Sequence, residues 1–273
     1  MTGQKTTVAK IDREALLKRI NRPAQTSTTH SDAWSNEQAK NWNSIVARIG
    51  KRYADCRLEN FRLSDDPQIA RDQRRVIDAL CEFGRRIEDN THLGRGIILF
   101  GPPGTGKDHL IVELMLAAIK RGLRVEYVTG MDLYGALRDA INEKRPEHQL
   151  VREYVTPEIL VLSDPLPPWG QLTDFQSAFL FRVVDRRYRD CRATWATLNV
   201  ANRDEAAERL GAQTVDRLRD GALAIWCSWP SYRSACRVPA VVESRDGPAG
   251  RNGDGRAAPE TDADATPSDP QTR

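Results

Sequence analysis

The chain has 273 residues, of which 40% are hydrophobic and 29% are charged, and its net charge at pH 7 is +3. No apolar run approaches the roughly 20 residues that cross a bilayer, so we expect a soluble cytoplasmic protein that does not contact a membrane. The mild charge neither requires nor excludes a nucleic-acid partner, because local patches matter more than the sum.

The five cysteines are too scattered for a metal site or a disulfide framework. They form no Cys-x-x-Cys pair, and their number is odd. This pattern indicates reduced thiols, as in the cytosol. The first 20 residues also lack the apolar stretch and the small-residue cleavage site of a signal peptide.

Residues 1–55 are polar and mixed in composition. Two helices are predicted there, Ile11–Ile20 and Trp34–Tyr53, with a linker rich in Pro, Ser and Thr between them. Because the region has too few apolar residues for a large core, its apolar stripes either bind a partner or dock on the main domain. We interpret residues 1–55 as a helical partner-binding region.

Residues 56–242 form the predicted body, in which short apolar strands alternate with helices. Such alternation is typical of an α/β fold with a buried parallel sheet covered by helices. Residues 243–273 contain no large apolar residue, so we predict a disordered tail. The predicted strands are 96–100, 124–129, 159–162, 193–198 and 223–227, and the predicted helices are 67–89, 107–120, 132–142, 175–188, 204–210 and 215–219.

A glycine-rich segment, Gly101–Asp108, joins the first strand to a helix. The spacing Gly101-x4-Gly106-Lys107 matches a phosphate-binding loop up to its last position. Glycines let the backbone N–H groups face phosphate oxygens, the helix N-terminus favours the same anion, and Lys107 supplies a positive charge. We predict ATP as the ligand, bound by Gly101, Pro102, Pro103, Gly104, Thr105, Gly106, Lys107, Asp108 and His109.

The last position of this loop departs from the pattern. A Ser or Thr hydroxyl normally binds Mg²⁺ there, whereas this chain has Asp108. Three interpretations stay open: Asp108 binds the metal, it repels the triphosphate, or it only stabilises the first turn of the helix.

A second acidic motif follows the predicted strand 159–162. In the direct register Ser163 occupies the position of a metal-binding Asp, and Asp164 occupies that of the acid that orients water. If the register shifts by one residue, Asp164 is the metal ligand instead; a plain strand-ending turn is the third interpretation. We predict Mg²⁺ as a cofactor, with Asp108, Ser163 and Asp164 as candidate ligands, and we favour an exchange of carboxylate and hydroxyl between positions 108 and 163.

Four segments together resemble bacterial helicase loaders of the DnaC type and the related IstB-like transposition ATPases, which are AAA+ proteins. The resemblance covers about residues 52–238, and it implies an AAA+ P-loop core that binds ATP. The segments are RYADCRLENF (52–61), GPPGTGKDHL (101–110), LGAQTVDRLRDG (210–221) and SWPSYRS (228–234).

The resemblance also implies roles in ATP turnover for Lys107, Asp164, Asn199, Arg217 and Arg233. Asn199 is similar to a sensor residue near the γ-phosphate, with Asn202 as an alternative. Arg217 resembles an arginine finger that reaches the ATP of a neighbouring subunit, with Arg219 as an alternative. Arg233 resembles a second sensor. For either arginine, a solvated helix charge is the plain alternative.

The function implied by the resemblance is ATP-dependent loading of a replicative DNA helicase, with contact to single-stranded DNA. The short chain after Ser234 leaves no room for a helical lid, so we expect an ATP-dependent homo-oligomer. The group Arg186, Arg187, Arg189 and Arg192 either lines a DNA contact or forms an exposed helix end. Two other functions stay open, a transposition helper ATPase and a non-hydrolysing nucleotide-binding scaffold, so weak ATP hydrolysis is neither predicted nor excluded.

Overall fold

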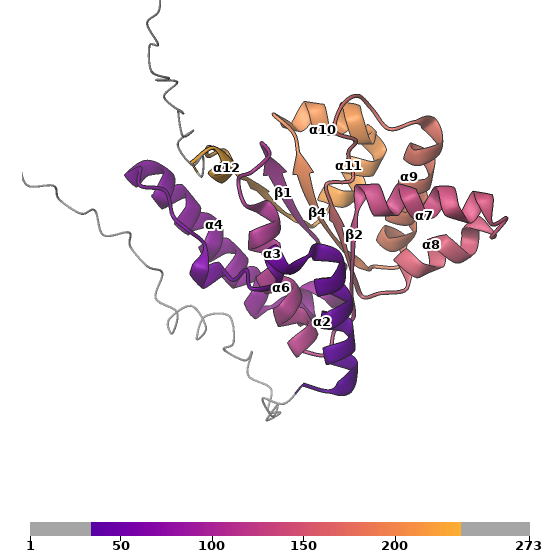
Figure 1. Cartoon of the computed structure of the whole chain (residues 1–273), viewed down its shortest axis with the longest axis horizontal. Coiled ribbons are helices and arrows are strands. Elements are labelled where there is room, and N and C mark those ends of the chain that lie inside the picture. The colour runs from indigo at the N-terminus through magenta and orange to yellow at the C-terminus, as the bar shows by residue number, and fades with distance from the viewer. Residues whose placement is uncertain (1–33, 236–273) are drawn as a thin grey trace, which may run out of the picture. The chain divides into compact units, whose positions relative to one another are not determined.

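The computed structural model describes residues 34–235, so the predicted helix 11–20 and the predicted tail 243–273 lie outside the described residues. Five parallel strands form one sheet in the order β2-β3-β4-β1-β5 (Figure 1). All five predicted strands are confirmed within one residue at each end. They are β1 (Ile97–Gly101), β2 (Val125–Thr129), β3 (Ile159–Ser163), β4 (Ala193–Asn199) and β5 (Leu223–Trp226).

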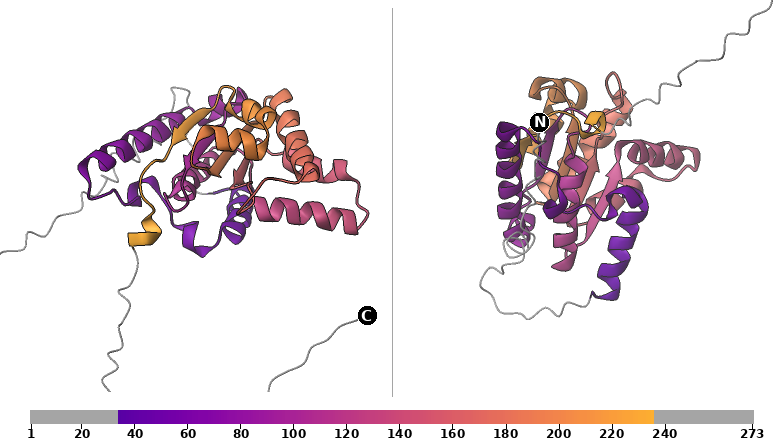
Figure 2. Two further views of the ribbon diagram at one scale, coloured as in Figure 1. Left: turned by 90° about the horizontal axis from the view of Figure 1, so that it is seen from above. Right: turned by 60° about the vertical axis from the view of Figure 1, so that its left-hand side comes forward.

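Helices cover both faces of the sheet, as predicted from the alternation of strands and helices (Figures 1 and 2). Side chains of β1 alternate between the two layers: Ile97 and Leu99 join one core cluster, and Ile98 and Phe100 join the other. The first layer holds α2 (Asn36–Ile49), α4 (Pro67–Arg85), α5 (Ile87–His92) and α6 (Lys107–Lys120), and the second holds α7 (Gly130–Asn142), α8 (Glu147–Val155), α9 (Asp174–Arg189), α10 (Arg203–Leu210) and α11 (Ala212–Arg219).

The predicted helices differ from the observed ones mainly where one predicted helix is interrupted and forms two. Gly50, with a φ of 83°, separates α2 from α3 (Lys51–Ala54), and Arg86 separates α4 from α5. Helix α8 has no counterpart in the prediction, because only two of its nine residues are buried, Leu150 and Tyr154, which lie four residues apart on one face. A short helix, α12 (Tyr232–Ala235), ends the described chain.

Helix α2 docks on the main domain. Its Ile45 and Ile49 are buried in the core. The Gln38 side chain donates hydrogen bonds to the carbonyls of Ile119 and Lys120, at the C-terminal end of α6. Asn41 pairs in both directions with the backbone of Val125, on the edge strand β2. Of the two alternatives for this helix, binding a partner or docking on the main domain, the structure shows docking. The docked helix also covers the exposed edge of the sheet at β2.

Arg187 corrects the prediction for the basic end of α9, because its side chain is fully buried (0% exposed) rather than solvated. The guanidinium donates to the carbonyls of Tyr154, Val155 and Pro157 from Nη1, to those of Glu158 and Ala193 from Nη2, and to Thr194 Oγ1 from Nε. Burial lowers the pKa of Arg187 to about 9. Arg187 therefore joins the end of α8 to the starts of β3 and β4, and it cannot contact DNA.

Among the described residues, no helix combines the length and the apolar composition that crossing a membrane requires.

Candidate nucleotide-binding site

The glycine loop leaves β1 and enters α6 at the edge of the sheet where the parallel strands end. Gly106 precedes α6 with a φ of 85°, in the left-handed region that favours glycine. A Cβ on Gly101 would lie 2.3 Å from the carbonyl oxygen of Cys227, just after β5. The loop thus needs glycine both for its turn and for its close approach to the neighbouring strand.

The Lys107 amine is held beneath the loop. Its Nζ lies 2.8 Å from the carbonyl oxygens of Gly101 and of Pro102, and 3.4 Å from Thr105 Oγ1. The side chain is buried, and this burial lowers the pKa of Lys107, although Asp108 and Asp164 act in the opposite direction. Phosphate oxygens that enter the loop would take over these hydrogen bonds from neutral carbonyls.

A cavity of about 450 Å³ opens next to the loop. It is lined by three segments that are far apart in the sequence: residues between 52 and 73, the loop with the start of α6, and residues 229–233. Asn199, at the end of β4, also lines it. A cavity of this size, with a phosphate-binding loop at one end, can hold a nucleotide.

The segment after β5 is fastened to the loop by hydrogen bonds. The indole N–H of Trp229 donates to the Thr105 carbonyl at 2.8 Å, and the backbone N–H of Tyr232 donates to the Gly104 carbonyl at 2.9 Å. The Tyr232 hydroxyl donates to the carbonyl of Arg62 at 2.6 Å. Residues 229–232 therefore connect the loop to the segment that precedes α4.

Phe61 lies at the centre of an aromatic cluster behind the loop. Its ring makes edge contacts with His109, Trp229 and Tyr232, at centroid distances of 5.3, 6.3 and 5.6 Å. The Nε2 atom of His109 lies 2.7 Å from the carbonyl oxygen of Arg57, and burial lowers the pKa of His109. His109 lines the cavity, but its ring is engaged with residues before α4.

Asp108, in the first turn of α6, accepts two hydrogen bonds on one carboxylate oxygen. Ser163 Oγ donates to Asp108 Oδ1 at 2.8 Å, and Thr197 Oγ1 donates to the same atom at 3.1 Å. Ser163 and Thr197 are register partners at the ends of β3 and β4. The structure thus brings together the two residues predicted to exchange roles, and it adds Thr197.

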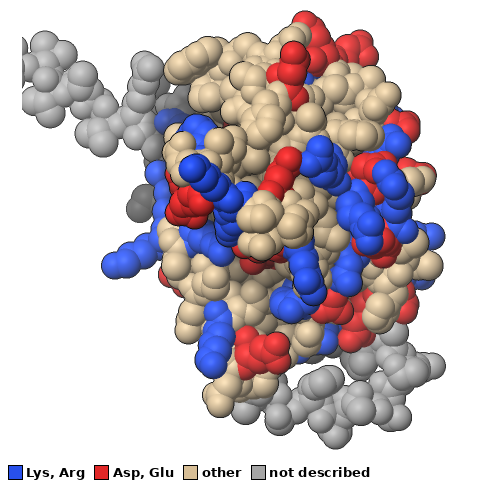
Figure 3. All heavy atoms as spheres, turned by 90° about the vertical axis from the view of Figure 1, so that its right-hand side faces the viewer, with Lys and Arg blue, Asp and Glu red and all other residues tan. Residues whose placement is uncertain are grey.

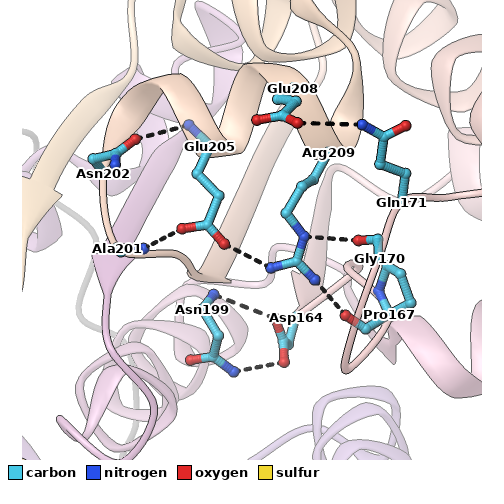
Figure 4. A network of polar contacts seen from close by, with 10 residues as sticks. All are labelled: Asp164, Pro167, Gly170, Gln171, Asn199, Ala201, Asn202, Glu205, Glu208 and Arg209. Atoms are coloured by element: carbon cyan, nitrogen blue, oxygen red, sulfur yellow. Dashed lines mark hydrogen bonds and ion pairs between the residues drawn. The ribbon is translucent and has the colours of Figure 1, made fainter.

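Asp164 is the first residue after β3, and its φ of 45° is unusual for a residue other than glycine. Asn199 donates to both of its carboxylate oxygens, from Nδ2 to Oδ2 at 2.5 Å and from the backbone N–H to Oδ1 at 3.3 Å (Figure 4). Burial raises the pKa of Asp164, and the bonds from Asn199 oppose this rise. The alternative sensor residue, Asn202, instead caps α10 by accepting from the Glu205 backbone N–H.

The predicted arginines lie in different places. Arg233 lines the cavity, on the side of Gly104. Arg217 is not among the lining residues. Its Nε lies 2.6 Å from Asp185 Oδ1, and its guanidinium lies 4.9 Å from the centroid of the Phe181 ring. Arg219, the alternative to Arg217, is exposed near the end of α11. Within one chain, therefore, Arg233 lies at the cavity and Arg217 does not.

Four residues with clear contacts in the site were not predicted as site residues from the sequence: Phe61, Thr197, Trp229 and Tyr232. Three of them fall in segments that carried the family resemblance, so those segments were a usable signal. For Thr197, the only signal was a hydroxyl near the end of an apolar strand.

A helix-covered parallel sheet, a glycine loop and a buried lysine at the start of the following helix define a P-loop nucleotide-binding protein. Residues 48–220 match the family described as IstB-like ATP binding protein, and the chain belongs to this family. It is an ATP-binding protein with the predicted AAA+ fold.

The chain is similar to both kinds of protein that the sequence suggested. It is 28% identical to the replicative helicase loader DnaC of Escherichia coli K12, over 67% of this chain and 71% of that protein. It is 29% identical to an insertion-sequence ATP-binding protein of Geobacillus stearothermophilus, over 56% of each. The crystal structure of the DnaC helicase loader shares its fold, with a TM-score of 0.56 and 23% identity, over 65% of this chain and 99% of the solved one.

Proposed function

We propose that this protein is an ATP-dependent AAA+ loader of a replicative DNA helicase, acting in the cytoplasm. The observation that carries the proposal is the cavity itself, whose walls include the segment between residues 52 and 73. That segment continues directly from the N-terminal region, residues 1–55, in which we place helicase binding. Nucleotide at the loop and partner at the N-terminal region would then act on one continuous stretch of chain. The similarity to DnaC loaders supports this assignment.

The residues of the loop explain how ATP would be held. The backbone N–H groups of residues 101–106 and the start of α6 would bind the phosphates, and Lys107 would face the β- and γ-phosphates. Mg²⁺ would neutralise charge on the phosphate oxygens, and the oxygens of Asp108 and Ser163 are ligands of the kind it prefers. Asp164, held by Asn199, would orient the attacking water, and Arg233 would contact the phosphates from the side of Gly104.

ATP hydrolysis is proposed to need a second copy of the chain. Arg217 lies outside the cavity of its own chain, and its side chain is 28% exposed between Asp185 and Phe181. A guanidinium in this position is available to the ATP of a neighbouring subunit, which is the role of an arginine finger. Slow hydrolysis that speeds up on assembly is the expected behaviour; no turnover under any condition would favour a nucleotide-binding scaffold.

Single-stranded DNA is the proposed second ligand, on the strength of the similarity to loaders. The face formed by α7, α8 and α9 is a poor candidate for the contact, because its Lys and Arg residues alternate with Asp and Glu (Figure 3). Several of these arginines are paired: Arg145 with Glu153, Arg182 with Glu147 and Arg186 with Asp190. Paired charges attract DNA phosphates weakly.

The proposal is tested by mixing the full chain with the replicative helicase of its own organism in ATP, in ADP and without nucleotide. We expect a complex in ATP on size-exclusion chromatography, and its loss in Lys107→Ala. Helicase binding that is the same in ATP, in ADP and without nucleotide, or no helicase binding, would contradict the proposal.

A transposition helper ATPase is the second candidate, favoured by the family match and by the insertion-sequence relative. It predicts ATP-dependent binding of duplex DNA rather than of a helicase. The same chromatography with duplex and with single-stranded DNA separates the two functions.

A further inference from the structure

We infer that the two protein ligands of Mg²⁺ have exchanged chemistry, so that the carboxylate comes from Asp108 on the loop helix and the hydroxyl from Ser163 on the strand. The inference rests on the ATP binding proposed above and deepens it. P-loop proteins usually hold the ion with a Ser or Thr at the end of the loop and an Asp at the end of a neighbouring strand. Here each position carries the residue type expected at the other.

The contact between the two positions is intact, but its direction is reversed. Ser163 Oγ on β3 donates to Asp108 Oδ1 on α6 at 2.8 Å, where the usual pair would have the helix hydroxyl donate to the strand carboxylate. The formal charge of the pair is unchanged, at one carboxylate. Mg²⁺ takes only one or two ligands from protein and keeps several waters, so one carboxylate and one hydroxyl suffice.

Thr197 fixes the orientation of the carboxylate. Its Oγ1 accepts the backbone N–H of Asp164 at 3.2 Å, which directs its own proton toward Asp108 Oδ1, 3.1 Å away. Both bonds from the hydroxyls therefore fall on Oδ1. Within the described part of the chain, Oδ2 of Asp108 accepts no hydrogen bond, and Asp108 lines the cavity. The acid is anchored as a ligand would be, with one oxygen left for the ion.

The competing register gives the metal to Asp164, and the contacts of Asp164 speak against it. Both of its carboxylate oxygens are engaged by Asn199, and its backbone N–H is bonded to β4. Ser163 is also the last residue of β3, whereas Asp164 follows the strand with a positive φ. Asp164, held by Asn199, therefore suits the water-orienting role, and Ser163 suits the metal.

The experiment is a double-mutant cycle on the full chain: wild type, Asp108→Thr, Ser163→Asp and the double mutant. ATP affinity is measured by calorimetry with Mg²⁺ and with EDTA, and Mn²⁺ binding is followed by electron paramagnetic resonance with a non-hydrolysable ATP analogue. Asp108→Asn, which keeps an oxygen acceptor for Ser163 but loses the charge, guards against misfolding in Asp108→Thr. Asp174→Asn, an exposed acid in the first turn of α9, is the matched control.

We expect Asp108→Thr and Asp108→Asn to lose about tenfold or more of the Mg²⁺-dependent part of ATP affinity, the range found when metal sites are disturbed. ATP affinity in EDTA should not fall, and the double mutant should regain the metal dependence. Tighter Mg²⁺-ATP binding by Asp108→Thr alone, or additive effects in the cycle, would overturn the exchange. ATP binding that is absent in wild type, with or without Mg²⁺, would instead overturn the proposed function and the exchange with it.

Discussion

The indole of Trp229 donates its hydrogen bond to the carbonyl of Thr105, 124 residues earlier in the chain and in the middle of the phosphate loop. The carbonyl is thereby satisfied inside the protein, and the loop is held from the side opposite to its N–H groups. A residue beyond the last strand therefore takes part in shaping the nucleotide site.

Trp229→Phe should reduce both stability and ATP affinity. The ring contact with Phe61 can persist, but the Thr105 carbonyl loses its donor, which costs about 1–3 kcal/mol for a buried group. Urea unfolding and calorimetry measure the two effects. Trp169→Phe, at an exposed tryptophan, is the control and should change neither. Unchanged ATP affinity in Trp229→Phe would show that the hydrogen bond from Trp229 to Thr105 does not shape the site.

Lys107→Ala should abolish most ATP binding. Hydrogen bonds to charged groups contribute about 1.5–3 kcal/mol, so the loss should be at least about tenfold in Kd by calorimetry. Lys120→Ala, at the opposite end of the same helix, is the matched control. Equal affinities in Lys107→Ala and wild type would mean that phosphate does not displace the loop carbonyls from the amine.

Glu113→Gln should change how stability depends on pH. Burial raises the pKa of Glu113 to about 7, despite Arg57 at 3.5 Å. An acid whose pKa is higher in the folded state stabilises the fold at low pH, and this contribution is lost as pH rises from about 4.5 to about 7.

We compare the free energy of unfolding of wild type with that of Glu113→Gln. The advantage of wild type should shrink as pH rises over this range, by a few kcal/mol at most. Urea unfolding at several pH values measures the difference. The comparison cancels the opposite trend of His109, whose lowered pKa makes it destabilise the fold on acidification. A difference that is flat with pH would mean that Glu113 stays ionised.

Arg187→Met should destabilise the protein by at least about 3 kcal/mol, because several buried carbonyls lose their donor at once. Arg187→Lys should rescue only part of the loss, since an ammonium has three donors and no planar fork. Arg186→Met, at an exposed neighbour, is the control for thermal unfolding. A change in Arg187→Met no larger than in the control would refute this account of its role.

Arg217→Ala should still bind ATP as a monomer but fail to assemble or hydrolyse with ATP. Loss of its partly exposed pair with Asp185 should lower stability by only about 0–1 kcal/mol. Light scattering measures the assembly, and a phosphate-release assay measures the hydrolysis. Arg219→Ala, at the alternative arginine, is measured beside it. Normal assembly and turnover in Arg217→Ala would remove it as the arginine finger.

Much of the fold could be predicted because its signals are local. Apolar runs bounded by turns gave the strands, and the spacing from Gly101 to Lys107 gave the loop. Helix α8 was missed, since two buried side chains among nine residues give a weak period. The burial of Arg187 could not be predicted, because its acceptors come from the end of α8, from the loop before β3 and from β4.

The site shows the same division. The pairing of Asp108 with Ser163 was predicted, because both positions belong to known motifs, the phosphate-binding loop and the acidic motif after the strand. The contribution of Thr197 depends on β3 and β4 being adjacent, and strand order is not written in any local pattern. The docking of α2 was likewise open, because an apolar stripe does not say what covers it.

Helix α6 begins at the phosphate loop and ends under the side chain of Gln38, and it has 14 residues, about 21 Å of packed rod. The loop and helix α2 of the N-terminal region therefore contact opposite ends of one stiff element. If binding at one end shifts this element, thermodynamic linkage makes the effect mutual. The factor by which ATP raises the affinity for a partner must equal the factor by which that partner raises the affinity for ATP. Titrating the partner with and without ATP, and ATP with and without the partner, checks the equality.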